Sequence, residues 1–139
     1  MLRQAGRLQL KREPLDVRTT TVEIQAEDFG ELIGEDLSGV TFVRDYVQLQ
    51  FNPPPTLNAY TPVTVRCGQE VATFGEASFP NLLIGQLNKV VQRVDLVPDV
   101  ALTLIFDDRS SISISLLPAD YVGAEAVNLF CKNNKWVVL

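Results

Sequence analysis

The sequence predicts an α+β domain made mainly of antiparallel sheet, and three observations lead to this prediction. Short apolar runs alternate with polar residues and are separated by turn residues, which is typical of strands joined by hairpins. Two short segments, 27–33 and 78–85, carry the terminal glycines and first-turn residues of helices. Similar runs recur at about 32–61 and 83–117, and duplicated units of this size usually pack as paired halves of one core.

The internal repeat is marked by two identical tripeptides. Leu32-Ile33-Gly34 opens a run that reaches Phe51, and Leu83-Ile84-Gly85 opens another that reaches Phe106. The tripeptides are 51 positions apart and the phenylalanines 55 apart, so the second copy contains four extra residues. We expect both units to follow the same path of helix end, hairpin and third strand. The core positions made equivalent by the repeat are Leu49 with Leu104 and Phe51 with Phe106.

The elements of the first half follow from periodicity and turn residues. Gly34 is expected to end the first helix, and Arg44-Asp45 to form the tip of a hairpin. The three prolines at 53–55 predict a turn, because proline cannot donate to a strand ladder. In order, the expected elements are a strand at 19–24, a helix at 27–33, strands at 37–43 and 46–51, a strand at 57–67 interrupted at Pro62, and a strand at 71–74.

The second half repeats this scheme and adds a C-terminal helix and a final strand. Ile112 and Ile114 alternate with serines, which predicts a half-buried strand. In order, the expected elements are a helix at 78–85, strands at 87–96, 100–106 and 111–117, a helix over Gly123–Cys131 that buries Val122, Ala126, Val127 and Phe130, and a strand at 136–139. Sequential hairpins favour meander order within each half. Whether the halves form one sheet, a sandwich or a barrel is left open by the sequence.

Charge separates a basic N-terminal arm, residues 1–18, from a single domain over 19–139. The basic residues of the arm are Arg3, Arg7, Lys11, Arg12 and Arg18. The net charge is −5 for the chain, +3 for the arm and −8 for the domain. Two interpretations stay open: the arm lies on this acidic body or on a neighbouring copy of it, or it is a solvated leader.

Composition argues against several classes of protein. The 46% of hydrophobic residues is ordinary for a globular domain, and no apolar run approaches the roughly 20 residues that span a bilayer. Neither a secretory signal nor a membrane anchor is indicated, so we expect a cytoplasmic protein. An acidic domain disfavours nucleic-acid binding, because phosphate neutralisation needs clustered lysine and arginine. Cys67 and Cys131 lack metal-ligand spacing, and we expect two buried thiols, with a structural disulfide between them as the alternative.

The chain also lacks the usual catalytic motifs. It contains no histidine, which excludes hydrolases built on Ser-His or Cys-His pairs. Its glycines are not spaced as in dinucleotide-binding or phosphate-cradling loops. We therefore expect a protein that is not an enzyme, with no catalytic residue, no cofactor and no metal.

Two turns are candidate partner-binding sites. Arg44, Asp45 and Tyr46 combine residue types that are enriched in binding hot spots, although Asp45 could equally cap the turn while Tyr46 packs sideways. Asp107 and Asp108 form the second candidate; gathered with other carboxylates they could hold a hard cation, whereas turn propensity alone also produces this pair. We expect both turns to lie on one side of the molecule, as equivalent ends of the two repeats.

Two segments resemble those of small, uncharacterised bacterial proteins. Arg44-Asp45-Tyr46-Val47-Gln48-Leu49-Gln50-Phe51 matches an R-D-Y-V-x-L-x-F hairpin, and residues 118–126 match a P-x-D-x-x-G-x-E-A segment. Some of those proteins resemble immunity-type proteins encoded beside toxins. The resemblance covers about residues 30–130, and it implies a protein-binding module of the immunity type. The charge of −8 on the domain suggests that the partner it neutralises is basic. The alternatives are a small-ligand domain with a cleft between the repeats and a structural homo-oligomer subunit.

Overall fold

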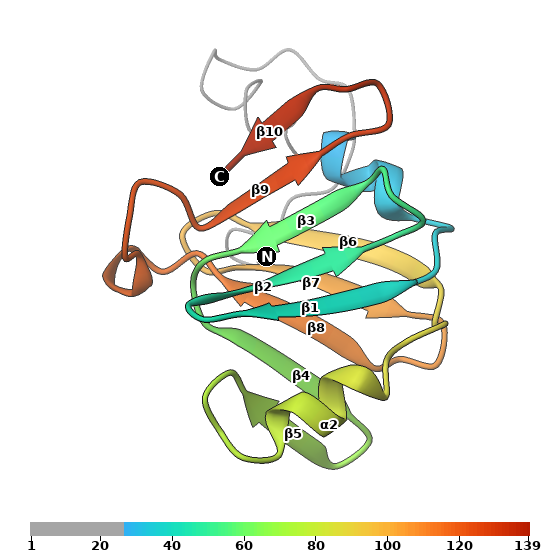
Figure 1. Ribbon diagram of the computed structural model, residues 1–139, viewed down its shortest axis with the longest axis vertical. Helices are drawn as coiled ribbons and strands as arrows, with labels where there is room; N and C mark the ends of the chain where they lie inside the picture. The colour runs from blue at the N-terminus through green and yellow to red at the C-terminus, as the bar shows by residue number, and fades with distance from the viewer. Residues whose placement is uncertain (1–26) are drawn as a thin grey trace, which may run out of the picture.

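The computed structural model describes residues 27–139, which form two five-stranded antiparallel sheets and only a few short helices (Figure 1). The mainly antiparallel architecture expected from the sequence is confirmed. The first sheet has the order β1 (Gly39–Val43), β2 (Tyr46–Gln50), β3 (Thr56–Ala59), β9 (Val127–Phe130), β10 (Trp136–Val138). The second has the order β5 (Glu70–Thr73), β4 (Val63–Cys67), β8 (Ser111–Ser115), β7 (Ala101–Phe106), β6 (Val91–Val97). The predicted arm at 1–18 and strand at 19–24 lie outside the described residues.

Each sheet combines a three-strand meander from one half of the chain with a hairpin from the other half. β1, β2 and β3 form the first meander, and β6, β7 and β8 form the second, as sequential hairpins predict. After β3 the chain crosses at Pro62 to the second sheet, where β4 pairs with β8. The later β9 returns to pair with β3. The halves are therefore joined by exchanged hairpins.

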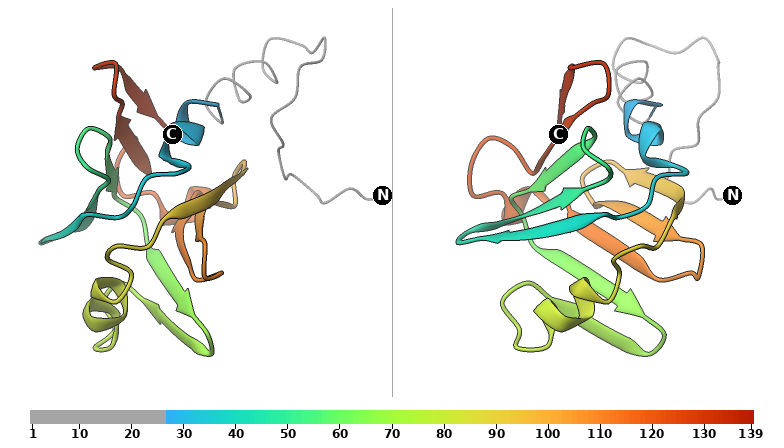
Figure 2. Two further views of the ribbon diagram at one scale, coloured as in Figure 1. Left: turned by 90° about the vertical axis from the view of Figure 1, so that its right-hand side faces the viewer. Right: turned by 45° about the vertical axis from the view of Figure 1, so that its right-hand side comes forward.

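The core lies between the two sheets, which Figure 2 shows from the side. In β2 and β8, buried apolar side chains that face inward alternate with polar ones that face outward. In β8, Ile112 and Ile114 are fully buried while the serines between them face outward, as predicted. Leu49, Phe51, Leu104 and Phe106 are also fully buried, so apolar side chains fill the space between the two sheets.

Short helices close two ends of this core. Residues 27–29 are helical and continue into η1 (Gly30–Leu32), which Gly34 ends with a φ of +90°. An ion pair of 3.0 Å between Asp28 and Lys135 links this segment to the β9–β10 turn. α2 (Phe79–Ile84) buries Phe79, whose ring lies edge-on to those of Phe42 and Phe74. A third helical turn, η2 (Pro118–Asp120), precedes β9.

The helix predicted over Gly123–Cys131 is wrong, because this segment contains β9. Val127 and Leu129 face the core while Asn128 and Phe130 face outward, which is a period of two. The apolar spacing of Val122, Ala126, Val127 and Phe130 imitates a helix, but β9 obtains backbone partners from β3 and β10 on its two sides. Val122 is consequently 90% exposed rather than buried.

Candidate functional site

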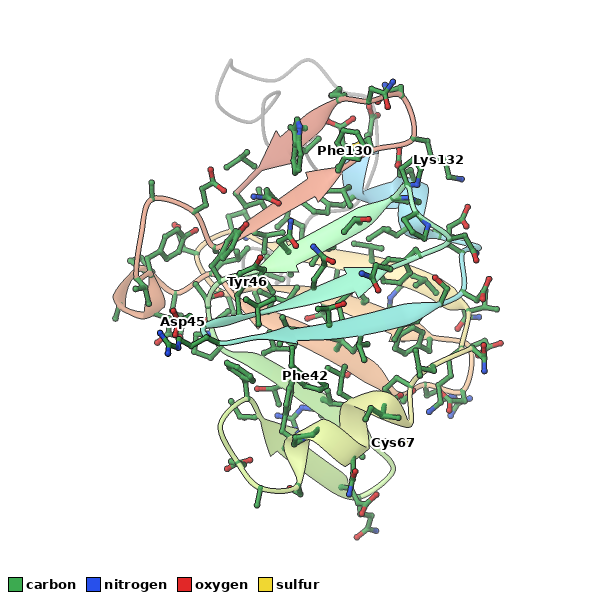
Figure 3. All side chains as sticks on the ribbon, viewed as in Figure 1. Phe42, Asp45, Tyr46, Cys67, Phe130 and Lys132 are labelled. Carbon is green, nitrogen blue, oxygen red and sulfur yellow. The ribbon has the colours of Figure 1, made fainter. Side chains whose placement is uncertain are left out.

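The β1–β2 turn presents Arg44 and Asp45 at an exposed tip. Val43 pairs with Tyr46 across the ladder, so Arg44 and Asp45 alone form the turn. The Tyr46 ring does not project from the tip but packs sideways against Tyr60, with ring centroids 5.0 Å apart. Figure 3 shows Asp45 at the edge of the first sheet, with Tyr46 beside it. The tip is therefore a charged pair supported by two tyrosines.

A hollow of about 390 Å³ lies beside this tip. Asp45 and Tyr60 line one part of it, and the loop of residues 122–125 lines the rest. Val122, almost fully exposed, supplies apolar surface, while Asp45 and Glu125 supply carboxylates. The sequence predicts Val122 and Glu125 in or next to a helix and gives no sign that they lie near the tip. We call these residues, Arg44, Asp45, Tyr60 and 122–125, the tip surface.

A chain of hydrogen-bonded side-chain amides ends at two residues of the tip surface, Tyr60 and Glu125. It crosses the outer face of the first sheet, and each amide donates to the next: Gln50 to Gln48 at 2.7 Å, Gln48 to Asn58 at 2.9 Å, and Asn58 to Asn128 at 2.8 Å. Asn128 then donates to the Tyr60 hydroxyl and to the Glu125 carboxylate, both at 3.0 Å. The alternation Tyr46-x-Gln48-x-Gln50 shows from sequence that these side chains share a face, but only the pairing of β3 with β9 brings Asn128 to them.

Asp108, predicted as a partner-binding residue, lies in a structural ion pair. It accepts hydrogen bonds from Lys89 Nζ at 2.8 Å and from the backbone N–H and hydroxyl of Ser110. These bonds, that from Lys89 first, lower the pKa of Asp108 to about 2. Burial alone would lower the pKa of Lys89, but Asp108 raises it. Lys89 also donates to Gln86, which is fully buried, at 2.9 Å.

The two predicted turns do not meet. In Figure 1 the β1–β2 turn lies at the left edge of the molecule and the β7–β8 turn, with Asp107 and Asp108, at the right edge. The expectation that the two turns are equivalent ends on one side is wrong. The β1–β2 turn is the first turn of its meander, whereas the β7–β8 turn is the second turn of the other meander. Successive turns of a meander lie at opposite ends of the strands. Within residues 27–139, no three carboxylates or thiols gather in a way that could hold a metal ion.

No protein-family model, curated protein or solved structure is significantly similar to this chain. Within the described part of the chain, none of the helices has the length and apolar character needed to cross a membrane.

Proposed function

We propose that this protein is a non-enzymatic protein-binding module, of the immunity type that neutralises a basic partner. The observation that carries the proposal is the tip surface, where an exposed apolar side chain, Val122, and two acidic residues, Asp45 and Glu125, line one hollow. An apolar centre with a polar rim, next to tyrosine and arginine, is the usual composition of a binding hot spot.

Charge favours a basic protein as the partner. Residues 27–139 have a net charge of −7, and the tip surface contains two acids and one arginine. An acidic surface attracts a basic protein over a distance of about one Debye length, roughly 10 Å at 0.1 M salt, which raises the association rate. The pairing of opposite potentials also excludes acidic competitors.

Rigidity supports the same proposal. The amide chain fixes the Tyr60 hydroxyl and the Glu125 carboxylate through Asn128, and Tyr46 packs against the Tyr60 ring. A surface whose side chains are already ordered loses less conformational entropy when a partner binds. The tip surface therefore has the preorganisation expected of a tight-binding inhibitor.

We also propose that the two halves are copies of one five-strand unit. The cross-strand row Val40, Leu49, Leu57 has the counterpart Val94, Leu104, Ile112, at 54 or 55 positions further along the chain. The exchanged hairpins extend both rows in the same way, since Leu57 pairs with Leu129 of β9 and its counterpart Ile112 pairs with Val65 of β4. At this offset Gly34 corresponds to Asn88, and both have a positive φ. The LIG tripeptides, 51 apart, are then out of step by three residues, close to one helical turn.

The binding proposal is tested by affinity capture from the native host and by binding kinetics with the captured protein. We compare the wild type with Val122→Arg and with the control Ile84→Arg, which changes another exposed apolar residue, at the end of α2. We expect a stoichiometric basic protein with the wild type and the control, lost with Val122→Arg. Its association rate should fall clearly between about 0.05 and 0.5 M salt. No stoichiometric partner, a salt-independent rate or undiminished capture by Val122→Arg would each contradict the proposal.

A further inference from the structure

The outer face of the second sheet is hollowed into a cleft of about 770 Å³. Three arginines line it: Arg66 from β4, Arg93 from β6 and Arg109 from the β7–β8 turn. Between them lie three hydroxyl side chains, Thr103, Ser111 and Ser113. The arginines are up to 43 positions apart in sequence, so only the sheet pairing brings them together.

Strand register places two of the arginines at the ends of a single row. Arg66 pairs with Ser111, Ser111 with Ile105, and Ile105 with Arg93, so the row crosses four strands. Neighbouring strands are about 4.8 Å apart, which puts the two ends of the row roughly 14 Å from each other. Arginine side chains extend about half that distance, so both guanidinium groups can reach a ligand that lies over Ser111 and Ile105.

The cleft is positive although the protein is acidic. Arg93 forms an ion pair of 3.2 Å with Asp95, a cleft residue that is nearly buried. Within residues 27–139, no acidic side chain pairs with Arg66 or Arg109. Three arginines therefore face one aspartate in the cleft, on a chain whose net charge is −5. The charges of Arg66 and Arg109 are therefore available to an anion that lies in the cleft.

The corresponding face of the first sheet is filled, which shows what the cleft lacks. There the row of Asn128, Asn58 and Gln48 consists of long amides that bond to one another. In the second sheet the row in the same register consists of Thr64, Ser113 and Thr103, whose short side chains leave the space above them open. The hydroxyls of Thr103 and Ser113 form a hydrogen bond of 3.1 Å with each other, which leaves one of their two protons free to be donated to a ligand.

We propose that this cleft binds a small ligand with two or more anionic groups, phosphates or carboxylates. Guanidinium groups form paired hydrogen bonds with either kind of oxyanion, and serine and threonine hydroxyls complete such a site. Among the described residues that line the cleft none is aromatic, so the site lacks a platform for stacking nucleic-acid bases. The ligand class is therefore a compact polyanion, and its site is separate from the tip surface.

The test uses pyrophosphate and citrate as probes, titrated at constant ionic strength with chloride while backbone amide shifts are followed by NMR. We expect saturable shifts centred on Thr103, Ser111 and Ser113 with at least one probe. A response to pyrophosphate alone assigns a phosphate ligand, a response to citrate alone assigns a carboxylate ligand, and a response to both supports the shared chemistry. No saturable shift up to about 50 mM of either probe, an affinity too weak for a built site, overturns the proposal.

Two variants separate the cleft from general charge effects. Arg66→Gln combined with Arg109→Gln should weaken probe binding at least about tenfold, because two charge-assisted contacts are lost. The control Lys132→Gln combined with Lys135→Gln removes the same number of charges from the exposed β9–β10 turn, outside the cleft, and should change the affinity less than about twofold. Equal affinity in the double variant and the wild type overturns the proposal. Partner capture through Val122 is expected to survive the double variant, so either proposal can fail alone.

Discussion

Replacing Asp108 by asparagine tests whether this carboxylate is structural. The change keeps an acceptor for the Ser110 N–H and hydroxyl but removes the negative charge beside Lys89, whose ammonium is 2.8 Å away. Lys89 retains the Gln86 and Ser110 oxygens as acceptors, so the lysine is not left without partners. We expect a moderate loss of stability and no unfolding.

The pKa of Asp108 sets the size of this loss. A fall from 3.8 to about 2 corresponds to roughly 2.4 kcal/mol if the pair were fully shielded from solvent. The Asp108 side chain is 47% exposed, however, and solvent weakens such a pair. We therefore expect Asp108→Asn to lower the free energy of unfolding by about 1 kcal/mol at pH 7, and the melting temperature by about 2–5 °C.

The same pair predicts a pH dependence. Because folding lowers the pKa of Asp108, its stabilisation is present above about pH 4 and is lost as the pH falls towards 2. Urea unfolding of the wild type, Asp108→Asn and the control Asp107→Asn should be measured at pH 7, 4 and 2. We expect the control, an exposed neighbour, to stay within about 0.5 kcal/mol of the wild type. Equal stability of the two variants, or an Asp108→Asn deficit that is the same at pH 2 as at pH 7, would contradict a stabilising role of the Asp108 carboxylate.

Three further predictions concern the core, the amide chain and the thiols. Phe106→Ala should cost about 3–5 kcal/mol in urea unfolding, because the ring is fully buried and leaves a cavity; a cost below 1 kcal/mol would contradict this packing. Asn128→Leu removes the acceptor of nearly buried Asn58 and should cost about 1–3 kcal/mol, against less than about 0.5 for the exposed control Asn81→Leu. Burial first, and then nearby carboxylates, raise the pKa of Cys131 to about 11, so a thiol reagent at pH 8 should modify half-buried Cys67 first; equal rates would count against this.

Local features of the fold could be predicted from the sequence because their causes are local. Gly34 ends a helix since it adopts a positive φ, and the Arg44-Asp45 turn follows from alternating strands on either side. Pro62 interrupts a long β run where the chain crosses between sheets. Each of these depends on residues within a few positions of one another.

Features that depend on distant pairing could not be predicted. The local sequence of β9 predicts a helix, because it gives no sign of the strand partners, β3 and β10, that stabilise it as a strand. The same pairing brings Asn128 to the amide chain and Val122 to the tip surface. The tip residues remain a proposed binding site. Asp107 and Asp108 lie in the β7–β8 turn, at the opposite edge of the molecule, because a repeat in the sequence does not show which turns lie on the same side of the fold.

The exchanged hairpins also determine how the chain can fold. A cut in the loop between β5 and α2 would leave each fragment with three strands of one sheet and two of the other, so neither fragment could complete a sheet. Pairing β3 with β9 joins residues about 70 positions apart, and such distant contacts slow folding because a long loop must close first. The two halves must therefore fold as one cooperative unit. Separately expressed fragments are each expected to stay unfolded and to regain structure only when they are mixed.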